Sequence, residues 1–131
     1  MKNASGTRLA GITLIILMLL LLAMHVLIIF DVLPYDMVWG GQIDARSSVV
    51  RYEAAALIIM LLFLAMVTLR LGYIRANRLK KAAVVGTWIV FAYFVFNSVT
   101  NFASGVSTEN LVFGPLSIAM ALLSLRVAMS R

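Results

Sequence analysis

Residues 9–30, LAGITLIILMLLLLAMHVLIIF, decide the fold. This run of 22 residues contains no charged side chain and one histidine, His25. The hydrocarbon core of a bilayer is about 30 Å thick, and about 20 helical residues cross it at 1.5 Å each. The run is continuous rather than alternating, which favours a helix over a barrel strand. It is also longer than the apolar part of a cleaved signal peptide, about 7–15 residues, so we expect it to be retained.

Three further apolar stretches follow, and we place the four spans at about 9–30, 52–73, 82–102 and 110–129. The chain is 63% apolar and 12% charged, whereas a soluble domain is about 25% charged. This composition excludes a soluble enzyme and an ordinary nucleic-acid-binding protein, despite a net charge of +6. The sequence therefore predicts an all-α membrane protein with one domain, residues 1–131, in which four transmembrane helices form an antiparallel bundle.

The charges are divided between the two ends of this bundle. Nine of the eleven basic residues fall at the N-terminus, at the C-terminus or in the link between the second and third spans. Only Arg46 and Arg51 fall on the other side, together with all five acidic residues. Because basic residues mark the cytoplasmic side, we predict an N-in, C-in topology in a bacterial cytoplasmic membrane. The basic cluster is explained by topology and by contact with anionic headgroups, without nucleic acid.

The fourth span carries a stripe of small residues at spacings of three and four. Small residues let membrane helices approach closely. The stripe predicts a packing face, directed either into the bundle or toward a second copy or another membrane protein. Its members are Gly114, Ser117, Ala121, Ser124 and Ala128.

Polar residues within the spans are concentrated toward the predicted outer side. Tyr93, Asn97 and Asn101 share one helical face, since they are four residues apart. His25 and the Tyr52–Glu53 pair lie at a similar predicted depth. A buried amide needs a hydrogen-bonding partner. These groups could therefore line an outward-facing pocket, or they could bridge helices and fix their register.

The predicted outer loop, residues 31–51, contains the string DVLPYDMVWGGQ at positions 31–42. Pro34 should end the first helix, and the apolar residues after it should lie at the membrane interface. Tyr35, Asp36 and Trp39 are candidate ligand contacts in this loop. We expect an ordered lid over the bundle; an aromatic anchor with no ligand beneath it is the alternative.

The string PYDMVWGG, with the Tyr-Glu entry to the second span and the later Asn-x-x-x-Asn, resembles small bacterial four-span membrane proteins of unassigned function. The resemblance extends over most of the chain. It implies the same topology and an important outer loop, and it implies no substrate or activity.

Three classes of function remain open. No acidic or lysine side chain lies in the middle of a span, which argues against proton-coupled transport. The chain has no cysteine, one histidine, and none of the common catalytic motifs, so we assign no catalytic residue, metal or cofactor. We therefore rank a binding or accessory protein above an oligomeric transporter or channel and above a small membrane enzyme. Such a protein would dock another membrane protein through the fourth span, or bind a small apolar or zwitterionic ligand under the outer loop. The candidate ligand-binding residues are His25, Tyr35, Asp36, Trp39, Tyr52, Glu53, Tyr93, Asn97 and Asn101.

Overall fold

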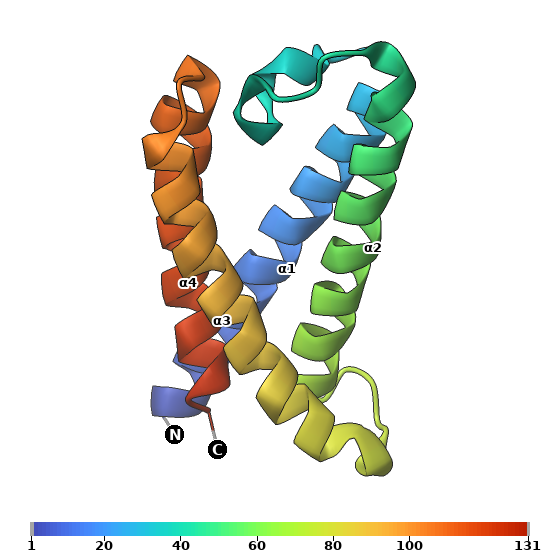
Figure 1. Ribbon diagram of the computed structural model, residues 1–131. Coiled ribbons are helices and arrows are strands. Elements are labelled where there is room, and N and C mark those ends of the chain that lie inside the picture. Colours follow the sequence, from blue (N-terminus) through green and yellow to red (C-terminus); the bar gives the residue numbers. More distant parts are fainter. Residues whose placement is uncertain (1, 131) are drawn as a thin grey trace.

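The computed structural model describes residues 2–130 and contains four long helices within that range (Figure 1). They are α1 (Lys2–Ile29), α2 (Arg46–Arg70), α3 (Lys80–Ala103) and α4 (Gly114–Ala128). Each, with its adjoining turn where there is one, is long and apolar enough to cross a membrane. The predicted all-α, four-helix membrane fold is confirmed. Short helical turns occupy the connections: η1 (Tyr35–Met37), η2 (Trp39–Gly41), η3 (Asn77–Leu79) and η4 (Glu109–Phe113).

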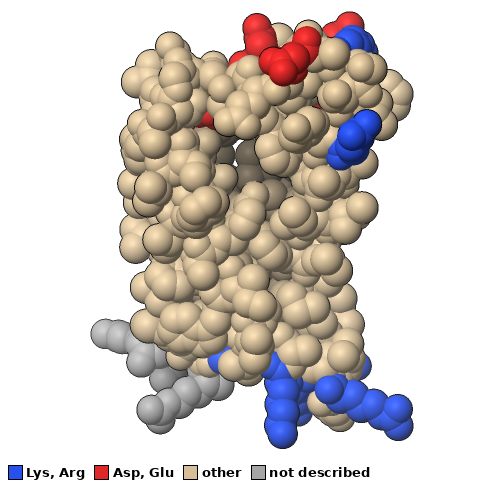
Figure 2. All heavy atoms as spheres, viewed as in Figure 1, with Lys and Arg blue, Asp and Glu red and all other residues tan. Residues whose placement is uncertain are grey.

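The helices form a ring in which each packs mainly against its two neighbours in sequence, and α4 closes the ring against α1. Successive helices run in opposite directions, so both termini lie at the same end (Figure 1). We call this the terminal end, and we call the opposite end, with residues 30–45 and 104–108, the loop end. Acidic side chains gather at the loop end and most basic ones at the terminal end (Figure 2). Arg131 and the side chain of Lys2 lie outside the described part of the chain.

The second helix begins earlier than predicted. It starts at Arg46, so the outer connection is shorter than the predicted 31–51 loop, and Tyr52 and Glu53 lie more than one turn inside a helix. The first turn, Arg46-Ser47-Ser48, is polar, and for this reason its hydropathy predicts a loop. A membrane helix can continue beyond the hydrocarbon with polar residues, since its backbone bonds are made within the segment. Hydropathy locates the apolar part of a helix and not its ends.

The half of the bundle nearer the terminal end is tightly packed. Leu14, Met18, Val67, Val90 and Val127 are fully buried there and come from all four helices. Toward the loop end the α3–α4 pair and the α1–α2 pair separate, and the 30–45 connection crosses between them (Figure 1). The bundle is thus closed at one end and open inside at the other.

A wide π turn, η4, precedes α4. The amide of Gly114 donates to the carbonyl of Glu109, five residues earlier. Pro115 explains this geometry, because proline has no N–H and its ring collides with the carbonyl four residues before it in an α-helix. The widened turn brings Glu109 into the interior, where it is only 6% exposed.

The small stripe of α4 faces the inside of this chain. All five members, Gly114, Ser117, Ala121, Ser124 and Ala128, are buried. A Cβ atom on Gly114 would lie 2.9 Å from the ring of Phe102 on α3, so this contact requires glycine. A partner protein at α4 would therefore meet the opposite face, which exposes Ile118 and Leu122.

Candidate functional site

A cavity of about 620 Å³ lies between the separated helix pairs, beneath the 30–45 connection. In the space-filling view it is visible as a hollow in the flank of the bundle, between the α3–α4 pair and α2 (Figure 2). The volume is typical of a small-molecule site. The opening lies along the apolar side of the bundle, so in a membrane it would face lipid.

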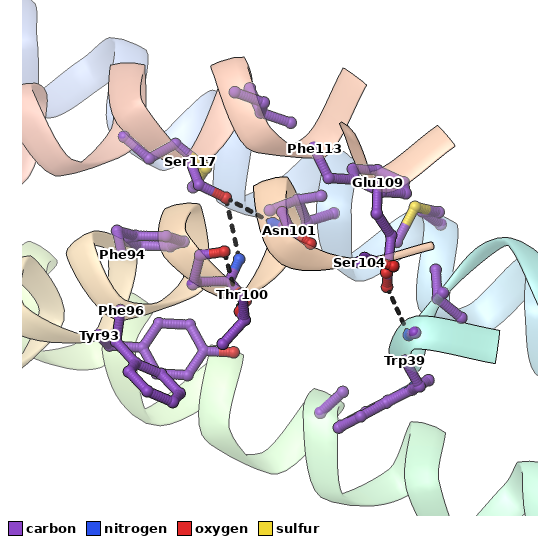
Figure 3. Close-up of a pocket in the computed structure, with 18 of the residues that line it drawn as sticks. Trp39, Tyr93, Phe94, Phe96, Thr100, Asn101, Ser104, Glu109, Phe113 and Ser117 are labelled. Atoms are coloured by element: carbon purple, nitrogen blue, oxygen red, sulfur yellow. Dashed lines mark hydrogen bonds between the residues drawn. The ribbon is translucent and has the colours of Figure 1, made fainter. Parts of the chain in front are cut away.

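The lining of the cavity changes from apolar to polar along its length. Leu21, Met60, Phe94 and Met120 form its inner end, one from each helix. Nearer the loop end, α1, α3 and α4 contribute polar groups, which are His25, Asn97, Asn101 and Ser117. Figure 3 shows Asn101 and Ser117 among them.

Glu53 connects three elements at the loop end. It is fully buried, and its Oε1 accepts a 2.8 Å hydrogen bond from Nε1 of Trp39. Its Oε2 lies 2.5 Å from Nδ1 of His25 on α1. Since an indole N–H can only donate, the carboxyl must accept from Trp39. Glu53 therefore ties the loop to α2 and fixes the ring of His25, which lines the cavity.

The backbone of the loop is unusual at the residues that cover the cavity. Trp39, Gly40 and Gly41 have φ angles of 58°, 63° and 67°. For a tryptophan this left-handed conformation costs about 1–2 kcal/mol. The bond from Trp39 to Glu53 and a ring contact with Tyr52, at 5.3 Å between centroids, hold the side chain in place. The two glycines allow the chain to continue the turn without strain.

The next residue ties the loop to the other helix pair. The amide of Gly40 donates a 2.8 Å hydrogen bond to Oε1 of Glu109 (Figure 3). Two consecutive residues are therefore held by two buried carboxylates: Trp39 by Glu53 of α2, and Gly40 by Glu109 of η4. The 30–45 connection, which we call the strap, crosses the loop end of the cavity.

One serine joins the two amides of α3. Asn97 and Asn101 both donate from Nδ2 to Oγ of Ser117, at 2.9 and 3.0 Å. The four-residue spacing puts the amides on the face that meets α4, as their sequence pattern suggested. This arrangement joins α3 to α4, and all three residues also line the cavity.

The structure brings some of the nine predicted site residues together and separates others. His25, Trp39, Tyr93, Asn97 and Asn101 line the cavity. Glu53 lies behind this lining, bonded to His25 and Trp39. The remaining three do not line the cavity: Asp36 is exposed, Tyr35 packs in the apolar cluster of the loop end, and Tyr52 supports Trp39.

Sequence reasoning did not select Glu109 or assign Ser117 to the cavity. The charge pattern indicates only that Glu109 lies on the outer side, and the small stripe indicates only a packing role for Ser117. The available signal for Glu109 was Pro115, six residues later, which prevents a regular α-helix before it. The signal for Ser117 was that two buried amides needed a polar partner on a neighbouring helix.

Within residues 2–130 no three His, Cys, Asp or Glu side chains are grouped so as to hold a metal ion. No family model, curated protein or solved structure matches the chain. The resemblance to small bacterial four-span proteins therefore stays a prediction.

Proposed function

We propose that this multi-pass membrane protein binds an amphipathic small molecule, which enters its cavity from the surrounding lipid. The supporting observation is the cavity itself, which is apolar at its inner end, polar at its loop end and open along the flank. The strap covers the loop end, so the flank offers the direct route of entry. The ligand would place its headgroup by Asn97 and Asn101 and its chain toward Met60 and Phe94.

Binding agrees better with this architecture than passage across the membrane does. The cavity ends at a core in which Leu14, Met18, Val67 and Val90 are fully buried. A transport path would have to open that core. We also propose that the loop end faces out of a bacterial cell, on the grounds of the basic residues at the terminal end.

Adjacent alanines on α2 allow a direct test. Ala56 lines the cavity, whereas Ala55 is exposed on the lipid-facing surface. The parent protein, Ala56→Phe and Ala55→Phe would be extracted from membranes in mild detergent, and their bound small molecules identified by mass spectrometry. Phenylalanine at position 56 should lower ligand occupancy about tenfold, equivalent to about 1.4 kcal/mol, by filling the site.

The control should retain the ligand, because Ala55→Phe adds the same volume outside the cavity. Equal occupancy in all three proteins, or no bound molecule in the parent, would contradict the proposal. In liposomes, the parent should pass no small solute, and a solute flux that Ala56→Phe blocks would favour the transporter instead.

A further inference from the structure

The lining of the cavity points to the chemistry of the headgroup. We infer, on the basis of the proposed binding function, that the cavity recognises a primary ammonium group carried on an apolar chain. Three features of the polar end support this inference: its charge, its hydrogen-bonding character and its aromatic walls.

The first feature is an uncompensated acidic group. Glu109 lines the cavity and is 6% exposed, and it accepts a hydrogen bond from the neutral amide of Gly40. Among the described residues no lysine or arginine lines the cavity. Between residues that the structure describes, ion pairs are found at other acids, Glu53 with His25 and Asp31 with Arg46. A buried carboxylate is costly without a cation, so a bound ammonium would be stabilised beside Glu109.

The second feature is a surplus of acceptors. Asn97 and Asn101 use their amide nitrogens on Ser117, and no hydrogen bond within residues 2–130 engages their side-chain oxygens. When Nδ1 of His25 donates to Glu53, Nε2 is an acceptor as well. A primary ammonium has three N–H donors, which matches this set. A carboxylate or phosphate headgroup would instead meet acceptors and a negative charge.

The third feature is aromatic. Trp39, Tyr93, Phe94, Phe96 and Phe113 all line the cavity. Figure 3 shows the aromatic side chains around the polar groups of α3 and η4. The faces of aromatic rings attract cations, most strongly where water is excluded. The walls thus favour a cation beside an apolar chain over a neutral polar group.

A comparison of four single-chain probes tests the inference: dodecylamine in its ammonium form, dodecyltrimethylammonium, dodecanol and dodecanoate. Binding to the reconstituted full chain would be followed by the fluorescence of Trp39, in a Trp88→Phe background that leaves one tryptophan. Dodecylammonium should bind about ten- to a hundredfold more tightly than dodecanol, as expected of a charge-assisted hydrogen bond.

Glu109→Gln should remove most of this preference. The side-chain oxygen of glutamine can still accept a hydrogen bond from the amide of Gly40, so the strap stays bound to η4. Asp36→Asn is the matched control: it also removes one negative charge at the loop end, from an exposed residue outside the cavity. An equal loss in both variants would mean that general attraction to the surface explains the preference, and the inference would fail.

The remaining outcomes separate the inference from the function on which it rests. If all four probes bind equally and Ala56→Phe weakens them all, the cavity binds amphiphiles but the ammonium assignment is wrong. If trimethylammonium binds as tightly as the primary amine, the acceptors play no part and the assignment to primary amines is overturned. If no probe binds, both proposals fail.

Two sources share this chemistry, a free fatty amine and the headgroup of phosphatidylethanolamine. Nanodiscs of phosphatidylcholine with and without phosphatidylethanolamine distinguish them. Displacement of dodecylammonium by phosphatidylethanolamine identifies the lipid as the source. Undiminished binding identifies the free amine, whose lack of a phosphate suits the position of Glu109.

Discussion

Replacement of Glu53 tests whether one buried carboxyl holds the strap in place. Glu53→Leu removes both acceptors and leaves the indole N–H of Trp39 and Nδ1 of His25 without their partner. Glu53→Gln is the control, because an amide can accept from Trp39 with its oxygen and donate to His25 with its nitrogen. The two variants have similar volume and neither carries a charge. Their difference therefore reports the hydrogen bonds.

The size of the effect follows from the two orphaned groups. A buried polar group that loses its partner costs about 1–3 kcal/mol, and hydrogen bonds within membranes reach about 1.7 kcal/mol. The lower part of this range, about 1 kcal/mol for each orphaned group, applies because the side chain of His25 is 13% exposed and so is not fully desolvated. We expect Glu53→Leu to lose about 2 kcal/mol of unfolding free energy, and Glu53→Gln to lose less than about 1 kcal/mol.

Two measurements check this prediction. The first is unfolding with increasing SDS in mixed micelles, followed by circular dichroism. The second is quenching of Trp39 by a water-soluble quencher in the Trp88→Phe background, where Glu53→Leu should expose the indole. If both variants unfold at the same SDS content as the parent, and Trp39 is equally protected from the quencher in all three proteins, the carboxyl of Glu53 does not secure the strap and the prediction is refuted.

Two other predictions concern packing and topology. Gly86→Ala should destabilise the bundle by about 1–3 kcal/mol, because the added Cβ would lie 2.5 Å from Cγ of Met66. Gly105→Ala is the control, since a Cβ there meets nothing within 4 Å. Unfolding of both variants in SDS checks this prediction, and equal stability of the two would contradict close packing of α2 on α3. The chain has no cysteine, so Asp36→Cys and Arg78→Cys each give a protein with a single cysteine. Each variant would be treated in intact cells with a maleimide that cannot cross the membrane. We expect labelling of Asp36→Cys alone, and labelling of Arg78→Cys alone would reverse the proposed orientation.

The fold was predictable because a bilayer imposes one dominant requirement. Apolar runs of about 20 residues can only be helices there, and short links between them make neighbours antiparallel. The face shared by Tyr93, Asn97 and Asn101 was predictable for a similar reason, since helical periodicity sets it. These inferences depend on local sequence alone.

The partners of the buried and charged side chains were not predictable, because they depend on contacts between residues distant in the sequence. Whether Glu53 is solvated or buried depends on where Trp39 and His25 lie, 14 and 28 positions away. Arg70, at the end of α2, donates to the carbonyls of Ala128 and Ser130 at the end of α4, 58 and 60 positions away, and its own position in the sequence does not indicate these partners. Charged residues near helix ends have several possible partners, and one sequence does not rank them.

The two ties of the strap have a geometric consequence. Trp39 is anchored to one helix pair and Gly40 to the other, and their Cα atoms are about 3.8 Å apart across a trans peptide. The two pairs are therefore joined at this end by two hydrogen bonds in series with one peptide unit, and this short segment limits how far the pairs can separate while both hydrogen bonds hold. A single residue inserted between positions 39 and 40 would act as a longer spacer, and it would let the two pairs move farther apart with both hydrogen bonds intact.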